Sequence, residues 1–385
     1  MSRYRSYLEV SKQVISDYQG EEPFSIYLRK FFSQKKKFGS TDRKTIAALC
    51  YSYFRAGHAL SGELEKKIVQ AFFLCSGSGH HFLEAIDKEL NAECERPLVD
   101  KLQLLQVKPH DLFPFRHHLS PEIDSDDFCL SHLHQPRLFL RLRTGKKQQV
   151  IQKLQAAGVS FVSAGNSALS LPNGTKLDGV IAVNREAVVQ DLSSQQTLDF
   201  LDAGIFGKLP VDVWDCCAAS GGKSILAFDK LQGKMRLTVT DIRPGVLKNL
   251  KGRLGEAGVP VYRSQLADLE KPVNDIGTFQ LIICDAPCTG SGTWSRVPEQ
   301  LHFFKAESIS RYVQLQKKII LNSIAQLQSC GIFVYITCSV FAEENEEQVE
   351  FITQQPGMTL LHQQYIKGYN GGADTLFSSA FRLSF

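Results

Sequence analysis

The sequence has 385 residues, 43% of them hydrophobic and 22% charged, which is the composition of an ordinary globular protein with room for two or three cores. No apolar stretch approaches the ~20 residues that a membrane helix requires. The net charge of +4 lies wholly in residues 131–200, which carry 8 Lys and Arg against 4 Asp and Glu. This excess is either a footprint for a phosphate backbone or an ordinary solvated surface.

Ten cysteines are scattered through the chain without a C-x-x-C pair, so neither a disulfide framework nor a zinc site is expected. His132 and His134 are assigned to a loop surface rather than to a metal site. The opening segment MSRYRSY lacks the apolar core of a secretory signal. We therefore expect a cytoplasmic protein that binds no metal and does not enter a membrane.

Residues 1–130 are expected to be helical. An N-cap is indicated at residues 39–43, and apolar side chains then recur at helical spacing, at Ile46, Leu49, Cys50, Tyr53 and Phe54. Further amphipathic stretches lie near residues 64–74 and 82–90. Three prolines between residues 109 and 121, followed by acidic residues 124–127, predict a linker.

Residues 131–200 are expected to form a small α/β unit that is basic on one side. The segment RLFLRLR at residues 137–143 alternates as a strand with arginines on one face. Residues 148–157 predict a helix, and residues 159–162 predict a return to strand.

From residue 211 onward, strands and helices alternate as in a doubly wound α/β sheet. The expected strands are residues 211–215, 237–241, 260–262, 281–285 and 332–337, with a helix over residues 312–328. Asp241 and Asp285 end two of these strands, and Asp268 follows a third. Because open parallel sheets bind ligands beyond the carboxyl ends of their strands, these acids are candidate site residues.

A glycine-rich turn, Cys217-Ala218-Ala219-Ser220-Gly221-Gly222-Lys223, follows the first of these strands. A strand, such a turn, a helix and an acid after the next strand form a general nucleotide-binding layout. A phosphate-binding P-loop would need glycine where Cys217 stands, and the G-x-G-x-x-G pattern of a NAD site is absent. The ligand that remains favoured is S-adenosylmethionine, with Asp241 accepting hydrogen bonds from its ribose.

Two cysteines stand at predicted strand ends, Cys288 in the segment DAPC and Cys338 in the segment TCS. A free cysteine is most often a small buried hydrophobe. Two of them at the ends of two strands of one sheet instead favour a chemistry that uses thiols.

Four segments resemble the Sun-type RNA cytosine-C5 methyltransferase family, whose bacterial members include 16S rRNA enzymes. Residues 215–223 resemble its cofactor loop, residues 285–290 its catalytic loop, residues 337–339 its nucleophile motif and residues 189–195 its lead-in to the catalytic domain. Together with residues 296–299 and 343–346, the likeness covers about residues 135–385. Residues 1–130 more loosely resemble a NusB-like helical RNA-binding domain.

The resemblance implies three parts: a helical, NusB-like domain over residues 1–130, a basic α/β RNA-positioning segment over residues 131–200, and a catalytic domain over residues 201–385. The catalytic domain would have the class I, Rossmann-like fold of S-adenosylmethionine-dependent methyltransferases. Two positions depart from the family pattern. Ser220 stands where a proline is common, and Arg143 stands where an asparagine is frequent.

The resemblance also implies roles for single residues. Cys338 would attack C6 of the cytosine, Cys288 would release the product as or through a general base, and Asp285 would hold the base near N3 and the exocyclic amine. Residues 217–223 would contact the cofactor through their backbone, with Asp241 at its ribose and Asp268 at its adenine, and Asp285 would also belong to the cofactor site.

The expected protein is thus an S-adenosylmethionine-dependent RNA cytosine-C5 methyltransferase that acts as a monomer on 16S rRNA during rRNA processing. Two alternatives stay open at this point. One is the same chemistry on tRNA, and the other is a non-catalytic RNA-binding factor of ribosome assembly that keeps the fold.

Overall fold

The computed structural model describes residues 3–35, 37–207 and 209–384. The chain divides into two compact units. The helical unit comprises the described residues of Met1–Leu119, Ile123–Gln135 and Thr293–Ala306, and the sheet unit comprises those of Ser120–Glu122, Pro136–Gly292 and Glu307–Phe385. Across the described residues, no helix has both the length and the apolar character needed to cross a membrane.

The helical unit is built from short and medium helices. These are α1 (Arg3–Asp17), α2 (Phe24–Gln34), α3 (Ser40–Ala56), α4 (Leu64–Cys75), α5 (His81–Ile86), α6 (Lys88–Ala92), α7 (Leu98–Leu104), α8 (Ser125–Ser131) and α13 (Glu299–Phe303), with 3-10 turns at Pro109–Leu112 and Arg116–His118. The Gly39 N–H donates to the Asp42 carboxylate (2.8 Å), which caps α3 as predicted. The five apolar residues predicted to line one face of α3 are all buried, which confirms that prediction.

A segment distant in sequence, residues 293–306, also belongs to the helical unit. The buried guanidinium of Arg55 donates to the carbonyl oxygens of His132 (2.9 Å) and Ser295 (2.6 Å). The Phe24 N–H donates to Glu299 Oε1 (3.2 Å). These hydrogen bonds join α13 and its flanks to α2 and α3, whereas the sequence predicts this segment within the catalytic domain.

Two sequence-based interpretations near residue 125 are wrong. The acidic segment 124–127 does not form a linker: the Asp124 carboxylate accepts from the Asp127 N–H (2.9 Å) and begins α8. His132 is not on a loop surface, because only 1% of it is exposed and its ring packs against those of Phe113 and Phe128.

The sheet unit contains a seven-stranded sheet with the order β10-β11-β9-β8-β5-β6-β7. Its strands are β5 (Val211–Asp215), β6 (Met235–Asp241), β7 (Val261–Leu266), β8 (Phe279–Asp285), β9 (Leu327–Thr337), β10 (Met358–Lys367) and β11 (Thr375–Leu383). The pairs from β7 through β9 are parallel, and only β11 runs antiparallel to both of its neighbours. This confirms the predicted α/β, Rossmann-like fold class.

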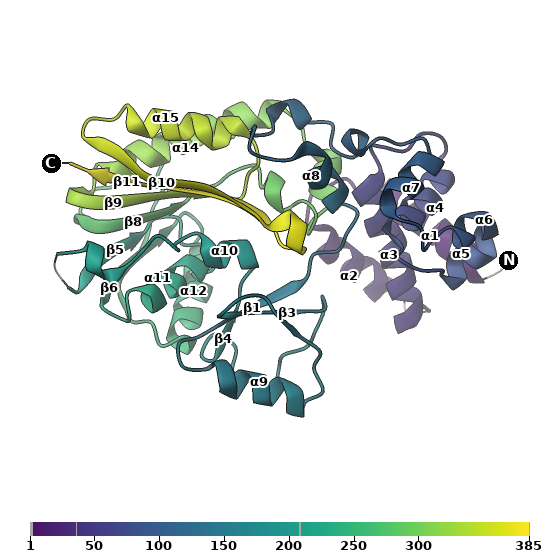
Figure 1. Ribbon diagram of the computed structural model, residues 1–385, viewed down its shortest axis with the longest axis horizontal. Helices are drawn as coiled ribbons and strands as arrows, with labels where there is room; N and C mark the ends of the chain where they lie inside the picture. Colours follow the sequence, from purple (N-terminus) through teal and green to yellow (C-terminus); the bar gives the residue numbers. More distant parts are fainter. Residues whose placement is uncertain (1–2, 36, 208, 385) are drawn as a thin grey trace. The chain divides into compact units, whose positions relative to one another are not determined.

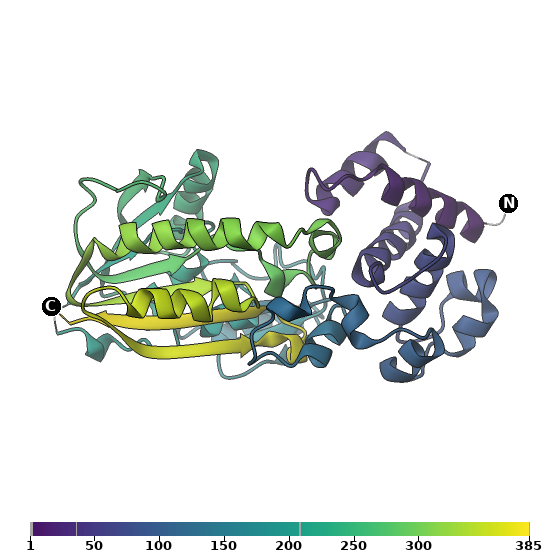
Figure 2. The ribbon, with the colours of Figure 1, turned by 90° about the horizontal axis from the view of Figure 1, so that it is seen from above.

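Helices cover both faces of this sheet, with α11 (Gly222–Lys230) and α12 (Pro244–Glu256) on one face and α14 (Glu307–Ile324) and α15 (Glu346–Thr353) on the other (Figure 1). Figure 2 shows α14 and α15 side by side over the strands. The buried core between the sheet and the first pair of helices is aliphatic, with members such as Val213, Leu237 and Ile283 fully inaccessible. The sheet order places β5 and β8 at its centre, so the loops after these strands are held by a rigid frame.

The predicted strand at residues 211–215 agrees with β5, whereas the predicted helix at residues 312–328 is displaced. Helix α14 begins at Glu307 and ends at Ile324, and β9 already begins at Leu327. The pairing of Leu327 with Phe279 of β8 extends β9 backward through a bulge at which Cys330 has a φ of +60°. Pairing with a neighbouring strand therefore overrides the helical pattern of residues 325–328.

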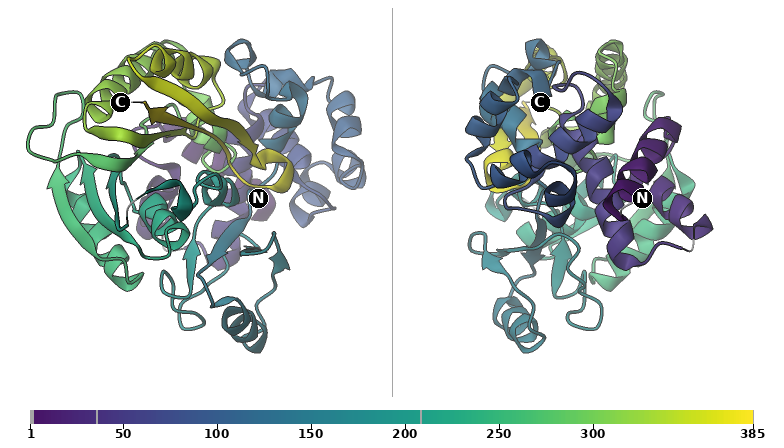
Figure 3. Two further views of the ribbon diagram at one scale, coloured as in Figure 1. Left: turned by 60° about the vertical axis from the view of Figure 1, so that its left-hand side comes forward. Right: turned by 90° about the vertical axis from the view of Figure 1, so that its right-hand side faces the viewer.

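A second sheet of the same unit has the order β2-β3-β1-β4 and is antiparallel throughout. Its elements are β1 (Leu138–Leu142), β2 (Val162–Ser163), β3 (Ala168–Leu171) and β4 (Ala187–Val189), with α9 (Lys147–Ala156) packed on it (Figure 3) and α10 (Leu192–Gln196) following. Arg141 and Arg143 both form ion pairs with Asp229 of α11. These two arginines of the predicted basic face are therefore turned inward and share one carboxylate.

Candidate active site

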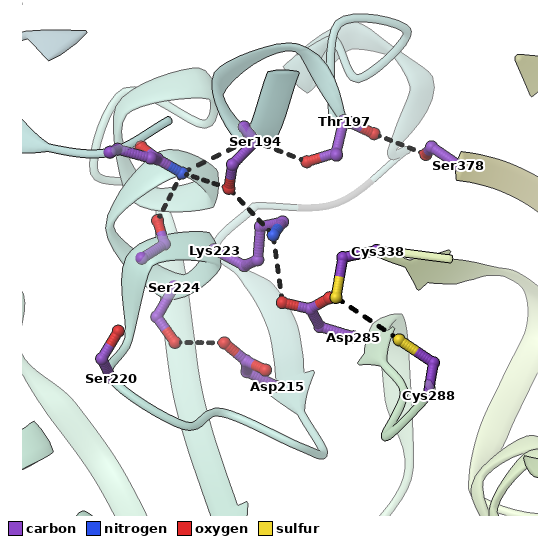
Figure 4. Close-up of polar contacts among 12 residues, drawn as sticks. Ser194, Thr197, Asp215, Ser220, Lys223, Ser224, Asp285, Cys288, Cys338 and Ser378 are labelled. Carbon is purple, nitrogen blue, oxygen red and sulfur yellow. Dashed lines mark hydrogen bonds and ion pairs between the residues drawn. The ribbon is translucent and has the colours of Figure 1, made fainter. Parts of the chain in front are cut away.

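The two cysteines singled out from the sequence lie together. Asp285 is the last residue of β8, and Cys338 directly follows β9, its parallel neighbour. The loop after β8 brings the Sγ atom of Cys288 to 3.4 Å from the Sγ atom of Cys338 (Figure 4). The structure therefore places Asp285, Cys288 and Cys338 at the carboxyl edge of adjacent strands, as the sequence predicts.

A close backbone approach holds the loop after β8 in place. The Gly292 N–H donates to the carbonyl oxygen of Cys338 (2.9 Å). A Cβ atom at Gly292 would lie only 2.1 Å from the carbonyl oxygen of Thr375 in β11. Glycine is thus required at this position, because any side chain would separate the loop from the segment that carries Cys338.

A buried carboxylate joins the two cysteine-bearing loops. Glu344 is fully inaccessible and accepts hydrogen bonds from the Thr289 N–H (2.9 Å), the Thr289 hydroxyl (2.5 Å), the Ser339 hydroxyl (2.5 Å) and the Gln316 amide (2.9 Å). Thr289 directly follows Cys288, and Ser339 directly follows Cys338. Burial raises the pKa of Glu344, while these four donors oppose that shift.

The sulfur contact also shifts the pKa of Cys288. The hydrogen bond with Cys338, assisted by burial, raises the pKa of the Cys288 thiol well above its ordinary value. The Cys288 thiol therefore holds its proton more strongly than a free cysteine does. Both cysteines are half-buried, so the pair is accessible to a substrate without being freely solvated.

Lys223 places a positive charge beside the catalytic loop. Its Nζ atom donates to Asp285 Oδ2 (3.0 Å) and to the Ser194 hydroxyl (3.0 Å), as Figure 4 shows. The Lys223 side chain is 8% exposed and that of Asp285 is 32% exposed. The orientation of the Asp285 carboxylate is thus fixed from the helix α11 side, while part of it faces outward.

The turn between β5 and α11 needs its glycine and its unusual backbone. Gly221 caps α11 with a φ of +80°, and a Cβ atom there would lie 2.4 Å from Leu250 Cδ1. Ala219 also has a positive φ, of +44°, and its N–H donates to Asp241 Oδ2 (3.1 Å). The turn after β5 is thereby joined to the end of β6.

Asp241 is 5% exposed and accepts several hydrogen bonds from its own loop. Arg243 contributes its backbone N–H (2.9 Å), its Nε atom (2.9 Å) and its Nη2 atom (3.0 Å). Although burial acts in the opposite direction, these donors hold the pKa of Asp241 below its ordinary value. The Arg243 side chain is 61% exposed, whereas the Asp241 side chain that it contacts is 5% exposed.

A cavity of about 490 Å³ joins these parts of the site. Five of the predicted cofactor residues line it: Cys217, Ala219, Asp241, Asp268 and Asp285. Cys288 and Cys338 line the same cavity. Its volume is in the range of small-molecule and cofactor pockets.

The remaining predicted cofactor residues do not border the cavity. Ala218, Ser220, Gly221, Gly222 and Lys223 shape the turn or support Asp285 instead. Ser220, which stands at the usual proline position, accepts from Arg253 through its hydroxyl (2.8 Å) and its carbonyl oxygen (3.0 Å).

Three side chains of the site were missed by sequence reasoning. Ile242 and Arg243 line the cavity, and Ile242 is 57% exposed although it is apolar. The sequence feature that could have identified these two residues is their position directly after Asp241, at the end of a predicted strand. Glu344 lay in an acidic segment noted only as a family feature, and nothing local indicated that it would be the buried one.

The region that contains this site matches a known family. Residues 210–374 match the family model described as 16S rRNA methyltransferase RsmB/F. The probable ribosomal RNA small subunit methyltransferase B of Bacillus subtilis is 28% identical over 239 residues, which are 60% of this chain and 53% of that protein. The chain spans about half the length of the first curated relatives that it matches.

Two solved structures share the fold. The crystal structure of PH0851 superposes with a TM-score of 0.71 at 17% identity and covers 99% of both chains. The structure of NSun6 from Pyrococcus horikoshii with SFG has a TM-score of 0.58 at 15% identity, over 71% of this chain and 97% of that one. The family match confirms the resemblance drawn from the sequence motifs. Over residues 210–374, this chain is thus similar to the RsmB/F family of 16S rRNA methyltransferases.

Proposed function

We propose that this chain transfers a methyl group from S-adenosylmethionine to C5 of a cytosine in RNA, and that the RNA is 16S rRNA. The observation that carries the proposal is the pair of thiols, Cys288 and Cys338, 3.4 Å apart on the wall of a cavity bordered by strand-end carboxylates. The names of the relatives support rRNA as the substrate.

The residues of the cavity fit a nucleoside cofactor. Asp241 offers carboxylate oxygens to ribose hydroxyls, with Arg243 moving aside, and Ile242 presents an exposed apolar side chain to a ring. Asp268 lines the same cavity, and we assign it to the adenine. When bound, S-adenosylmethionine supplies an electrophilic methyl carbon. The NSun6 neighbour, solved with SFG, supports a ligand of this kind.

The thiol pair supplies the sulfur nucleophile that activates cytosine for methylation at C5. C5 of cytosine is a weak nucleophile until a thiolate adds to C6, which moves the ring electron pair to C5. We assign that addition to Cys338. After C5 takes the methyl group, its proton must leave, and the electron pair then returns to the ring and expels the Cys338 sulfur. We assign this release to Cys288, acting as or through the base.

The polar residues around the pair would orient the cytosine. We assign Asp285 to N3 and the exocyclic amine, with Lys223 holding the carboxylate in place at 3.0 Å. Glu344 acts as a positioning residue, because it holds the residues that follow both cysteines. The target base would reach the thiols from a single-stranded loop or after leaving its stack.

We further propose that residues 1–130 and 131–200 position the RNA. Arg141 and Arg143 are engaged by Asp229, so the phosphate contacts in the second segment fall to its exposed basic side chains, such as Lys147, Lys176 and Arg185. Neutralising these three residues should weaken RNA binding and reduce its dependence on salt.

Methyl transfer to purified RNA tests the proposal. Labelled S-adenosylmethionine is incubated with the full chain and either unmodified 16S rRNA or unmodified tRNA, and the product is mapped by bisulfite sequencing. We expect one modified cytosine in 16S rRNA. Modification of tRNA alone would show that tRNA, not 16S rRNA, is the substrate. Methyl transfer to neither RNA would favour a non-catalytic assembly factor.

A further inference from the structure

Three cysteines that sequence reasoning left without a shared role lie together, and two of them, Cys216 and Cys217, line the cavity. Cys216 and Cys217 follow β5, and Cys284 is the penultimate residue of β8. Their Sγ atoms all lie within 4.8 Å of one another. Neither Cys216 nor Cys284 has a part in the chemistry proposed above.

The sheet register explains the convergence. Asp215 of β5 pairs with Ile283 of the parallel strand β8, and the Cys216 N–H donates to the Ile283 carbonyl oxygen (3.0 Å). The next residue along each strand, Cys216 and Cys284, is therefore a lateral neighbour on the same face. Cys216 also receives the hydroxyl of Ser323 from α14 at 3.6 Å.

Three thiols at this spacing match the needs of a thiophilic cation. Zinc binds thiolates at about 2.3 Å, so sulfurs in a tetrahedral site lie about 3.8 Å apart. The three sulfurs need to close by no more than about 1 Å to reach that spacing. Open zinc sites have three protein ligands and a fourth position for an exchangeable ligand.

The cluster also has an entry path. Cys216 and Cys284 are buried, but Cys217 is only half-buried, and both Cys216 and Cys217 line the cavity. An ion can therefore arrive through the cavity, and its fourth position can face that space.

We propose that Cys216, Cys217 and Cys284 form a three-thiolate site for a divalent cation of the zinc class. On binding, each of the three thiols gives up its proton and each sulfur donates an electron pair to the ion, with no change in oxidation state. The site is separate from the Cys288–Cys338 pair, and its occupancy does not depend on methyl transfer.

Zinc binding by the full chain tests the site directly. The protein, kept reduced without added thiols, is titrated with Zn²⁺ against a chromophoric chelator, and the zinc-loaded protein is examined by X-ray absorption. We expect one ion per chain with three sulfur ligands. A first shell made mostly of nitrogen and oxygen, or the absence of stoichiometric binding, would overturn the proposal without affecting the proposed methyl transfer.

Matched variants separate this cluster from the other thiols. Cys284→Ser should weaken binding at least about tenfold, the lower end of what losing a metal-supporting group costs. Cys330→Ser, at an exposed cysteine, and the double variant Cys288→Ser/Cys338→Ser should leave binding unchanged. Loss of binding in the double variant, with full binding in Cys284→Ser, would place the ion at the other pair and contradict the proposal. Because X-ray absorption uses the unmodified chain, a variant that fails to fold does not prevent a decision.

Discussion

The Sγ atoms of Cys288 and Cys338 lie 3.4 Å apart, although 50 positions separate the two residues in the chain. The parallel pairing of β8 and β9 brings the two loops to one edge, and Glu344 joins the residues that follow each cysteine. The geometry of the thiols is therefore maintained by groups outside the thiol pair itself. This dependence makes the supporting residues informative targets.

Glu344→Gln should lower kcat on the order of 10-fold to 100-fold while changing the KM for S-adenosylmethionine little. An amide turns one acceptor oxygen into a donor, which then faces the donors of Thr289, Ser339 or Gln316 and shifts the loops. Steady-state kinetics with the exposed neighbour Glu347→Gln as the control measures the effect. Equal activity of the two variants would contradict the positioning role of Glu344.

Lys223→Met should reduce kcat/KM for RNA by roughly 10-fold to 100-fold, because Asp285 loses the ammonium group that orients it. The matched control is Lys230→Met on the same helix, where the lysine pairs with Asp199 away from the cavity. Methyl-transfer rates of the two variants are compared at saturating cofactor. If both variants retain wild-type rates, the Lys223–Asp285 contact has no part in the reaction.

Gly292→Ala should destabilise the protein by roughly 1–3 kcal/mol and reduce activity, because its methyl group would collide with the Thr375 carbonyl oxygen. Gly252→Ala in α12 has open space around the new methyl group and should instead be neutral or stabilising by about 0.5–1 kcal/mol. Urea unfolding measures both changes. A wild-type unfolding midpoint for Gly292→Ala would show that the close approach is not rigid.

His132 should make stability fall as the pH decreases from about 6.5 to about 4. Burial lowers the pKa of His132 to about 4, so in this window the unfolded chain binds a proton that the folded chain does not. The loss amounts to roughly 3 kcal/mol, at 1.36 kcal/mol per pKa unit. His302, whose pKa burial also lowers to about 4, adds a change of the same sign.

The check on His132 is the urea midpoint of the wild type and of His132→Gln at several pH values. The variant should show a shallower decline between pH 6.5 and pH 4, with the remaining slope due in part to His302. Parallel curves for the two proteins would mean that His132 titrates with its ordinary pKa in the fold.

Local sequence patterns predicted the central strands and the acids at their ends, because apolar β-branched runs and glycine turns act over a few residues. The pattern also indicated the edge at which Asp285, Cys288 and Cys338 meet. It did not predict which of the acids after Cys338 would be buried, since Glu344 is selected by contacts with Thr289 and Gln316.

The other differences have the same origin in long-range contacts. Residues 325–328 continue a helical pattern, but pairing with β8 draws the last two of them into β9. The cluster of Cys216, Cys217 and Cys284 depends on the register between β5 and β8, which no local motif encodes. His132 became a core residue only through the rings of Phe113 and Phe128.

The central claim is that the sulfur of Cys338 bonds to the cytosine ring and that Cys288 is needed for its release. Cys288→Ala, incubated with 16S rRNA and S-adenosylmethionine, should accumulate a protein–RNA adduct that survives denaturing electrophoresis. Cys338→Ala and the double variant should form no adduct and no 5-methylcytosine. Full methyl transfer by Cys338→Ala, or an adduct that persists without that sulfur, would contradict the account.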